Sequence, residues 1–125
     1  QWLRAAGGPY PVAAISLLAA ETALEDTNSA NAFIARVANE RSQLTTLLAE
    51  HGAQPIPSQA NYVTARFSDI PAAATRTALA QRGIAVRGFP NHPDLDPYLR
   101  ITLPGNTQDF TRLTAALTEI LGGKP

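Results

Sequence analysis

The sequence predicts a small α+β domain of two layers, in which a roughly three-stranded sheet is covered by helices. Three observations support this class. Strand-like and helix-like segments in the C-terminal half follow the order β-α-β-β-α. A right-handed β-α-β crossover makes the first two strands parallel, which lets the third strand insert antiparallel to both. A chain of 125 residues with 45% apolar residues is also long enough to bury a core of its own.

The first part of the chain is predicted to form two helices. Pro9 and Pro11 indicate an extended entry to the first helix, which covers about residues 12–24. The second helix is indicated by apolar residues at helical spacing: Phe33, Ile34, Val37, Leu44, Leu47 and Leu48. The candidates for its N-terminal cap are Asn28, Ser29 and Asn31. Gly52 is placed to end it. We therefore expect a linker with domain-connecting helices over residues 1–52 and the small α+β domain over residues 53–125.

The second part supplies the sheet and two more helices. The predicted strands cover residues 62–67, 84–87 and 98–103. Pro71 lies at the expected first turn of the helix between the first two strands, and Gly83 is placed to terminate that helix. Asn106 is expected to cap the last helix, whose apolar stripe consists of Phe110, Leu113, Leu117 and Leu121.

Composition excludes several classes of function. Ten basic and ten acidic residues cancel, so no net field favours nucleic acid or an anionic membrane, and we expect neither as a partner. The absence of cysteine excludes disulfides, a thiolate nucleophile and zinc-thiolate sites. The longest apolar stretch, residues 12–20, is much shorter than the ~20 residues that span a bilayer. We expect a soluble, cytoplasmic protein.

Two further features predict that this chain is part of a larger protein. It contains no methionine, so Gln1 is expected to follow upstream sequence that has been removed. Its only lysine, Lys124, precedes the C-terminal Pro125 in a Gly-Gly-Lys-Pro tail. A lysine in such a tail is not expected to enter a packed active site.

Arg87 and Arg100 are the candidate binding residues. Both lie in or at the end of predicted strands, so that one hairpin could present two guanidinium groups close together. The planar guanidinium suits bidentate binding of a carboxylate or phosphate. A structural ion pair or an exposed edge position explains the same spacing, and spacing alone favours that structural explanation. No catalytic, cofactor-binding or metal-ligating residue is predicted.

Two histidines carry weaker signals. His51 follows Glu50 at the end of a predicted helix, where a cation meets the favourable end of the helix dipole, so a capping role is favoured over catalysis. His92 lies with Asp94 and Asp96 in a proline-bounded loop. Histidine and aspartate side chains can ligate metals, but a solvated loop is the favoured interpretation.

The remaining polar candidates are interpreted structurally. Glu40 and Arg41, beside Arg36, are typical of the charged face of a helix. Asn61 precedes a strand and is expected to bind backbone or form a turn, with a buried amide facing a site as the alternative.

Five segments occur in order and carry a resemblance to a known family. They are Gly-Gly-Pro-Tyr-Pro-Val at 7–12, Glu-Arg at 40–41, Ser-Gln-Ala-Asn-Tyr-Val at 58–63, Arg-Gly-Ile-Ala-Val-Arg at 82–87 and Tyr-Leu-Arg-Ile-Thr at 98–102. Together they resemble the C-terminal portion of the histidinol-phosphate aminotransferases, within the fold-type-I pyridoxal-phosphate aminotransferases. The likeness covers essentially the whole chain.

The resemblance implies a function and a fold. In that family a large domain binds pyridoxal phosphate through a lysine, which would lie upstream of Gln1, and a small C-terminal domain completes the enzyme. The implied reaction exchanges an amino group between glutamate and imidazole-acetol phosphate, with 2-oxoglutarate as the keto form of glutamate, in histidine biosynthesis. The implied enzyme is a homodimer. The chain alone is expected to bind no cofactor and to be inactive as a transaminase.

The resemblance also assigns residues. Arg100 corresponds to the family arginine that grips the substrate anion, either the α-carboxylate of glutamate or the phosphate of histidinol phosphate. Arg87 matches a second arginine associated with phosphate recognition. Tyr10 and Asn61 match recurrent positions without an assigned contact.

One departure leaves the substrate open. The family commonly continues Arg-Ile-Thr with Val-Gly-Thr, whereas this chain has Leu-Pro-Gly at 103–105, which is expected to shift the turn before the last helix. Threonine-phosphate decarboxylases and other amino-acid aminotransferases share the implied architecture and remain alternatives. A stand-alone, non-catalytic α/β module that binds an anion or a protein is the alternative from another class.

Overall fold

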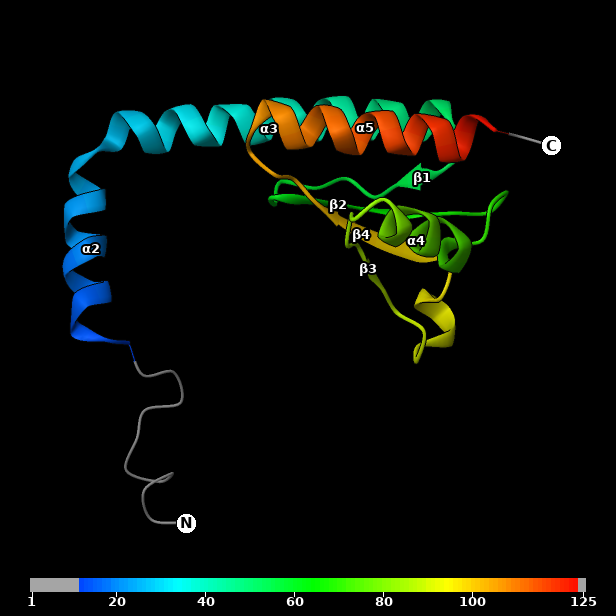
Figure 1. Cartoon of the computed structure of the whole chain (residues 1–125), viewed down its shortest axis with the longest axis horizontal. Coiled ribbons are helices and arrows are strands. Elements are labelled where there is room, and N and C mark those ends of the chain that lie inside the picture. The colour runs from blue at the N-terminus through cyan, green and yellow to red at the C-terminus, as the bar shows by residue number, and fades with distance from the viewer. Residues whose placement is uncertain (1–11, 124–125) are drawn as a thin grey trace, which may run out of the picture. The chain divides into compact units, whose positions relative to one another are not determined.

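The computed structural model describes residues 12–123. Contacts divide the chain into two compact units, one up to Ala32 and one from Phe33 onward. The elements, in order, are α2 (Ala14–Glu25), α3 (Thr27–Glu50), β1 (Gln54–Pro55), β2 (Tyr62–Arg66), α4 (Ala72–Gln81), β3 (Arg87–Gly88), the short 3-10 helix η1 (Pro93–Leu95), β4 (Tyr98–Thr102) and α5 (Thr107–Gly122) (Figure 1). The predicted α+β class is confirmed.

The sheet has four strands in the order β1-β2-β4-β3, and each neighbouring pair is antiparallel. Strands β2 and β3 are therefore parallel to each other with β4 inserted between them, as the crossover argument predicted. The number of strands differs from the prediction because β1 pairs with β2 at the edge. Pro55 has no N–H to donate, and an edge strand is where a sheet tolerates that.

The strand predicted over residues 84–87 is shorter in the structure. Only Arg87 and Gly88 pair with β4. The Ile84 N–H instead donates to the Leu79 carbonyl at 2.9 Å, so this segment still closes the end of α4 and is not available to the ladder. The prediction was wrong for residues 84–86.

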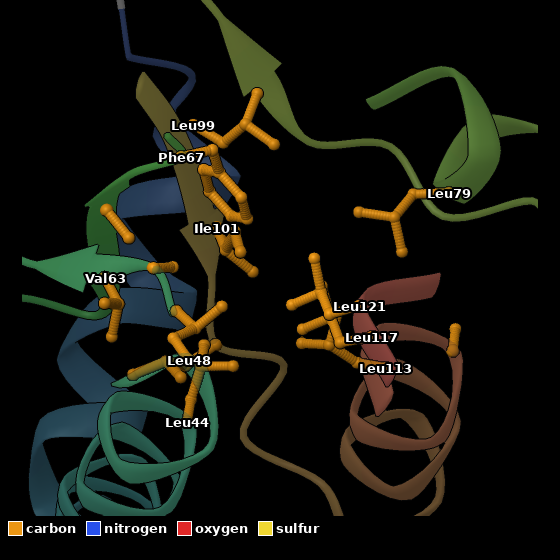
Figure 2. Close-up of a cluster of buried hydrophobic side chains, with 14 of the residues drawn as sticks. Leu44, Leu48, Val63, Phe67, Leu79, Leu99, Ile101, Leu113, Leu117 and Leu121 are labelled. Carbon is orange, nitrogen blue, oxygen red and sulfur yellow. The ribbon is translucent and has the colours of Figure 1, made fainter. Parts of the chain in front are cut away.

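The core lies between one face of the sheet and three helices. Val63 and Ala65 of β2, with Leu99 and Ile101 of β4, are buried at alternating positions and face the same side. Figure 1 shows α5 and the later part of α3 running over this face. Figure 2 shows the helical side chains that meet it: Leu44 and Leu48 of α3, Leu79 of α4, and Leu113, Leu117 and Leu121 of α5. Each such side chain contributes about 1.5–3 kcal/mol by leaving water.

The apolar stripe of α3 begins one turn later than predicted. Val37, Leu44 and Leu48 are buried, but Phe33 and Ile34 are 49% and 64% exposed. Phe33 lies outside the core because its ring packs against the backbone of Gly105, in the turn after β4. Phe33 and Ile34 therefore share the helical spacing that indicated α3 but do not belong to the core.

Polar groups define several helix ends as expected. The Asn106 Oδ1 accepts the Asp109 N–H at 2.9 Å, which caps α5 as predicted. Helices α3 and α4 end close to Gly52 and Gly83, also as predicted.

The predicted cap of α3 was wrong. The helix begins at Thr27, so Asp26 occupies the capping position. The Asp26 Oδ1 accepts the Ser29 N–H at 3.0 Å. Hydrogen bonding to the Ser29 side chain, and next to the Ser29 N–H, lowers the pKa of the Asp26 carboxyl.

Helix α2 buries none of its residues. Its large apolar side chains, Ile15, Leu17, Leu18 and Leu24, are all more than half exposed. None of the helices over residues 12–123 combines the length and apolarity that crossing a bilayer requires.

Candidate functional site

The sheet face opposite the core carries the polar side chains of the two central strands. Because β2 and β4 alternate, Tyr62, Thr64 and Arg66 share this face with Tyr98, Arg100 and Thr102. We call it the open face. Most of its side chains are half-buried or exposed, in contrast to the fully packed face beneath the helices. Strand β3 adds Arg87 to it, opposite Arg100.

Both predicted binding residues lie on the open face. Arg87 and Arg100 are direct cross-strand partners in the β3–β4 ladder. The Cβ atoms of such partners lie about 4.5–5.5 Å apart, and like charges placed directly opposite destabilise a sheet. Arg100 is half-buried and Arg87 is exposed. The two residues therefore lie opposite each other on neighbouring antiparallel strands, which is the arrangement that the sequence-based argument required.

Aromatic rings orient both guanidinium groups. Arg100 Cζ lies 5.0 Å from the centroid of the Tyr62 ring, and Arg87 Cζ lies 5.6 Å from that of Phe89. A cation above a ring gains electrostatic attraction while its N–H donors stay available. The rings therefore restrict the guanidinium positions without occupying their hydrogen bonds.

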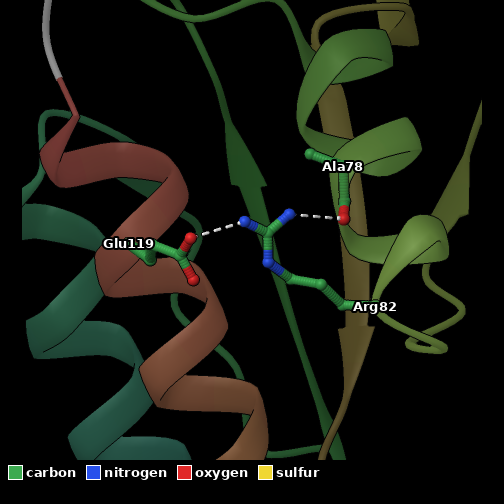
Figure 3. A network of polar contacts seen from close by, with 3 residues as sticks. All are labelled: Ala78, Arg82 and Glu119. Carbon is green, nitrogen blue, oxygen red and sulfur yellow. Dashed lines mark hydrogen bonds and ion pairs between the residues drawn. The ribbon is translucent and has the colours of Figure 1, made fainter.

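Neither arginine has an acidic partner among the described residues. The ion pair that this part of the chain does contain joins Arg82 Nη2 to Glu119 Oε1 at 2.7 Å, between α4 and α5 (Figure 3). The Nε of Arg100 is also buried without a hydrogen-bond acceptor from residues 12–123. Two guanidinium groups without an acidic partner on one face have the chemistry that can hold a carboxylate or a phosphate.

The structure also locates the two histidines. The Nδ1 of His51 lies 2.8 Å from the Leu47 carbonyl oxygen at the end of α3, which is the predicted capping role. His92, Asp94 and Asp96 are exposed in the loop around η1. Over residues 12–123, no three His, Cys, Asp or Glu side chains come close enough together to hold a metal ion.

Asn61 takes a backbone role, as expected. Its side chain is exposed, and its carbonyl accepts the Leu103 N–H at 2.9 Å, which extends the β2–β4 ladder by one bond. Tyr10 lies outside the described residues.

Glu40 corrects the interpretation of a charged helix face. It is only 3% exposed, and its Oε2 accepts the Gly105 N–H at 2.8 Å. Arg36 and Arg41 do not point freely to solvent either, since each donates to a backbone carbonyl of a loop. Helical spacing cannot reveal these contacts because their partners lie far along the chain.

The sequence interpretation overlooked the aromatic part of the site. The period of two in each strand, which can be seen in the sequence, places Tyr98 on the same face of β4 as Arg100 and Tyr62 on the same face of β2 as Thr64. The place of the Tyr62 ring beside Arg100 also needs the register of β2 with β4, which the sequence does not give.

Comparison with known proteins gives a consistent result. A sequence profile of aminotransferase class I and II matches residues 1–117. The chain is 37% identical over 112 residues to histidinol-phosphate aminotransferase 1 of Hydrogenovibrio crunogenus, covering 90% of this chain and 31% of that protein. It is 39% identical over 112 residues to histidinol-phosphate aminotransferase 2 of Burkholderia lata, with the same coverage. The chain thus spans about a third of the length of these relatives.

A solved structure supports the fold. The histidinol-phosphate aminotransferase of Clostridium acetobutylicum superimposes with a TM-score of 0.79 at 22% sequence identity. The match covers 98% of this chain and 37% of that one.

Proposed function

Because the chain belongs to the aminotransferase class I and II family, we propose that it is the small, substrate-binding part of a pyridoxal-phosphate-dependent aminotransferase. The named relatives favour a histidinol-phosphate aminotransferase, which would transfer an amino group between glutamate and imidazole-acetol phosphate. This reaction belongs to histidine biosynthesis. The proposed enzyme is a cytoplasmic homodimer.

One observation carries the proposed binding role: Arg87 and Arg100 lie opposite each other across the β3–β4 ladder without an acidic partner among the described residues. Their mutual repulsion is relieved when an anion lies between or above them. Arg100 binds the anionic group of the substrate, a carboxylate or a phosphate, because it is the more enclosed of the two and its Nε lacks an acceptor. Arg87 provides the second set of donors from the edge.

The described residues do not fit the role of cofactor anchor. Pyridoxal phosphate is held as a Schiff base by a lysine amine. Residues 12–123 contain no lysine, since the single one is Lys124. We therefore assign this chain to substrate binding and leave attachment of the cofactor to another part of the enzyme. The chain on its own should not catalyse transamination.

The test uses the longer polypeptide that carries this chain, supplied with pyridoxal phosphate. Amino transfer from glutamate to imidazole-acetol phosphate is the expected activity, measured as formation of 2-oxoglutarate. O-phosphothreonine and aromatic amino acids serve as competing substrates in parallel reactions. Decarboxylation of O-phosphothreonine without transfer from glutamate would favour the decarboxylase alternative. A stable monomer with no cofactor-dependent activity would instead identify a non-catalytic binding module.

A further inference from the structure

We infer that helix α3 sets the position of the anion site through a socket around Gly105, and that Glu40 is the central positioning residue of this socket. The Gly105 socket consists of Phe33, Arg36 and Glu40, all in α3, which enclose Gly105 in the turn between β4 and α5. The inference rests on the proposed function, because it concerns where Arg100 lies on the open face.

The socket contacts every backbone group of one glycine. The Gly105 N–H donates to Glu40 Oε2 at 2.8 Å, and the Gly105 carbonyl accepts from Arg36 Nη1 at 2.9 Å. The Phe33 ring covers the Cα, where an added Cβ would overlap the ring at 2.7 Å from its Cζ. Gly105 has a φ of 69°, a conformation that residues with a Cβ rarely adopt. The three contacting residues occupy positions i, i+3 and i+7 and therefore one face of α3.

Burial shows that the Glu40 contact is specific. A carboxylate loses hydration when it is buried, so a buried glutamate is kept only where it makes a directed interaction. Glu40 is 3% exposed, with one oxygen bound to Gly105 and Oε1 buried without a partner among the described residues. Arg36, one helical turn earlier, places its positive charge on the carbonyl side of the same glycine.

Arg41 attaches a second loop to the same helix. Its Nη1 donates to the Ala60 carbonyl at 3.0 Å and to the Gln59 carbonyl at 3.4 Å. Residues 59–60 lead directly into β2, whereas Gly105 follows β4. Adjacent residues of α3 therefore hold the two segments that bound one end of the β2–β4 ladder.

This end of the ladder contains the ring that orients Arg100. The Leu103 N–H donates to the Asn61 carbonyl at 2.9 Å and joins the two held segments to each other. Tyr62 is the next residue, and its ring lies 5.0 Å from Arg100 Cζ. A displacement of either segment thus shifts Tyr62 relative to Arg100. Glu40 acts on the anion site through this backbone and does not touch the ligand.

The test is a phosphate titration of the 125-residue chain followed by NMR, with inorganic phosphate as the probe. The Nε–H signal of Arg100 and the amide of Gly105 report binding in the folded population, so a loss of stability alone does not change the fitted affinity. Glu40→Met removes the acceptor, and Glu40→Gln retains one carbonyl oxygen for the Gly105 N–H. Glu119→Met and Glu119→Gln are the matched controls at an exposed carboxylate that contacts Arg82 (Figure 3).

Glu40→Met is expected to weaken phosphate binding about fivefold, within the coupling seen between residues of one contact network. Glu40→Gln should restore most of the affinity, and both Glu119 variants should bind as the parent does. If Glu40→Met fails to fold, Arg41→Met takes its place. This variant removes only the hydrogen bonds from Arg41 to the Gln59–Ala60 loop, and we expect the same loss of phosphate affinity.

Three outcomes overturn the inference. Unchanged phosphate affinity in the folded Glu40 and Arg41 variants contradicts the positioning role of Glu40. In that case the proposed function still stands if the parent chain binds phosphate and the Arg100→Gln variant does not. Equal losses of affinity in Glu40→Met and Glu119→Met show that the effect is not specific to the Gly105 socket, which contradicts the positioning role. A parent chain that gives no phosphate-dependent shift contradicts the anion site itself, and the inference fails with it.

Discussion

Arg87 and Arg100 are direct partners across the β3–β4 ladder, and residues 12–123 supply no acidic side chain to either of them. The sheet therefore carries two positive charges at a position where like charges are unfavourable. In the proposed function, this relationship makes the open face a site for anions and links stability to ligand binding.

Replacing Arg87 tests that link. Arg87→Gln should leave the anion-free fold as stable as the parent or more stable by up to about 1 kcal/mol, because the cross-strand repulsion is removed. Added phosphate should raise the melting temperature of this variant less than that of the parent. Thermal unfolding at low ionic strength measures both effects. Arg66→Gln is the control, since Arg66 lies on the same face but donates to Ser68 Oγ at 3.0 Å. A lower melting temperature for Arg87→Gln without anion would contradict the repulsion.

Gly105 should tolerate no side chain. Gly105→Ala combines a φ of 69° with overlap between the new Cβ and the Phe33 ring, so we expect a loss of about 1–3 kcal/mol in the free energy of unfolding. Chemical denaturation measures the loss. The double variant Gly105→Ala/Phe33→Ala separates the two causes, because it removes the overlap and leaves the backbone strain. A Gly105→Ala variant as stable as the parent would show that the socket does not constrain this turn.

The cap of α5 should make a measurable contribution to stability. Asn106→Ala removes the acceptor of the Asp109 N–H and is expected to cost about 1 kcal/mol. Asn106→Ser keeps a capping oxygen and should recover most of this loss. Both values come from denaturant unfolding curves. If serine and alanine give the same stability, the contact seen at 2.9 Å does not stabilise the helix.

The Arg82–Glu119 pair predicts a pH dependence. Arg82 lowers the pKa of the Glu119 carboxyl through a hydrogen bond and through its charge. A carboxyl whose pKa is lowered in the folded state stabilises the fold above its unfolded pKa, and this stabilisation disappears as the pH falls through the folded pKa. Glu119→Gln should therefore be slightly less stable than the parent at neutral pH and match it at low pH, where Glu119 is protonated, so that the acidic part of its stability profile is flatter. The difference at neutral pH should be small because the pair is exposed. If the stability of Glu119→Gln falls as steeply with decreasing pH as that of the parent, the pH dependence arises from other groups.

The spacing of apolar residues and the residues that typically begin or end helices predicted most of the fold. The alternation in residues 62–67 and 98–103 placed two central strands, and their order along the chain placed β4 between β2 and β3. Asn106 could be identified as a cap because its partner is three residues away. Interactions this local are visible in sequence.

What the sequence did not predict depends on contacts between distant residues. Glu40 belongs to a charged helical surface by spacing, and only the fold places Gly105 against it, 65 residues later. Strand β1 is two residues long and contains a proline, so it has no pattern of its own. The pairing of Arg87 with Arg100 was predictable as a hairpin, whereas the Tyr62 ring beside Arg100 followed only from the register of β2 with β4.

The central claim is that Arg100 binds the anionic group of the substrate in an aminotransferase. The most direct test is steady-state kinetics of the polypeptide that carries this chain, comparing Arg100→Gln with the control Arg66→Gln. We predict that Arg100→Gln raises the KM for the anionic substrate roughly a hundredfold, as expected when a charge pair loses one partner. The absorbance of the bound cofactor should remain, and Arg66→Gln should resemble the parent. An unchanged KM together with loss of the cofactor absorbance would contradict the claim.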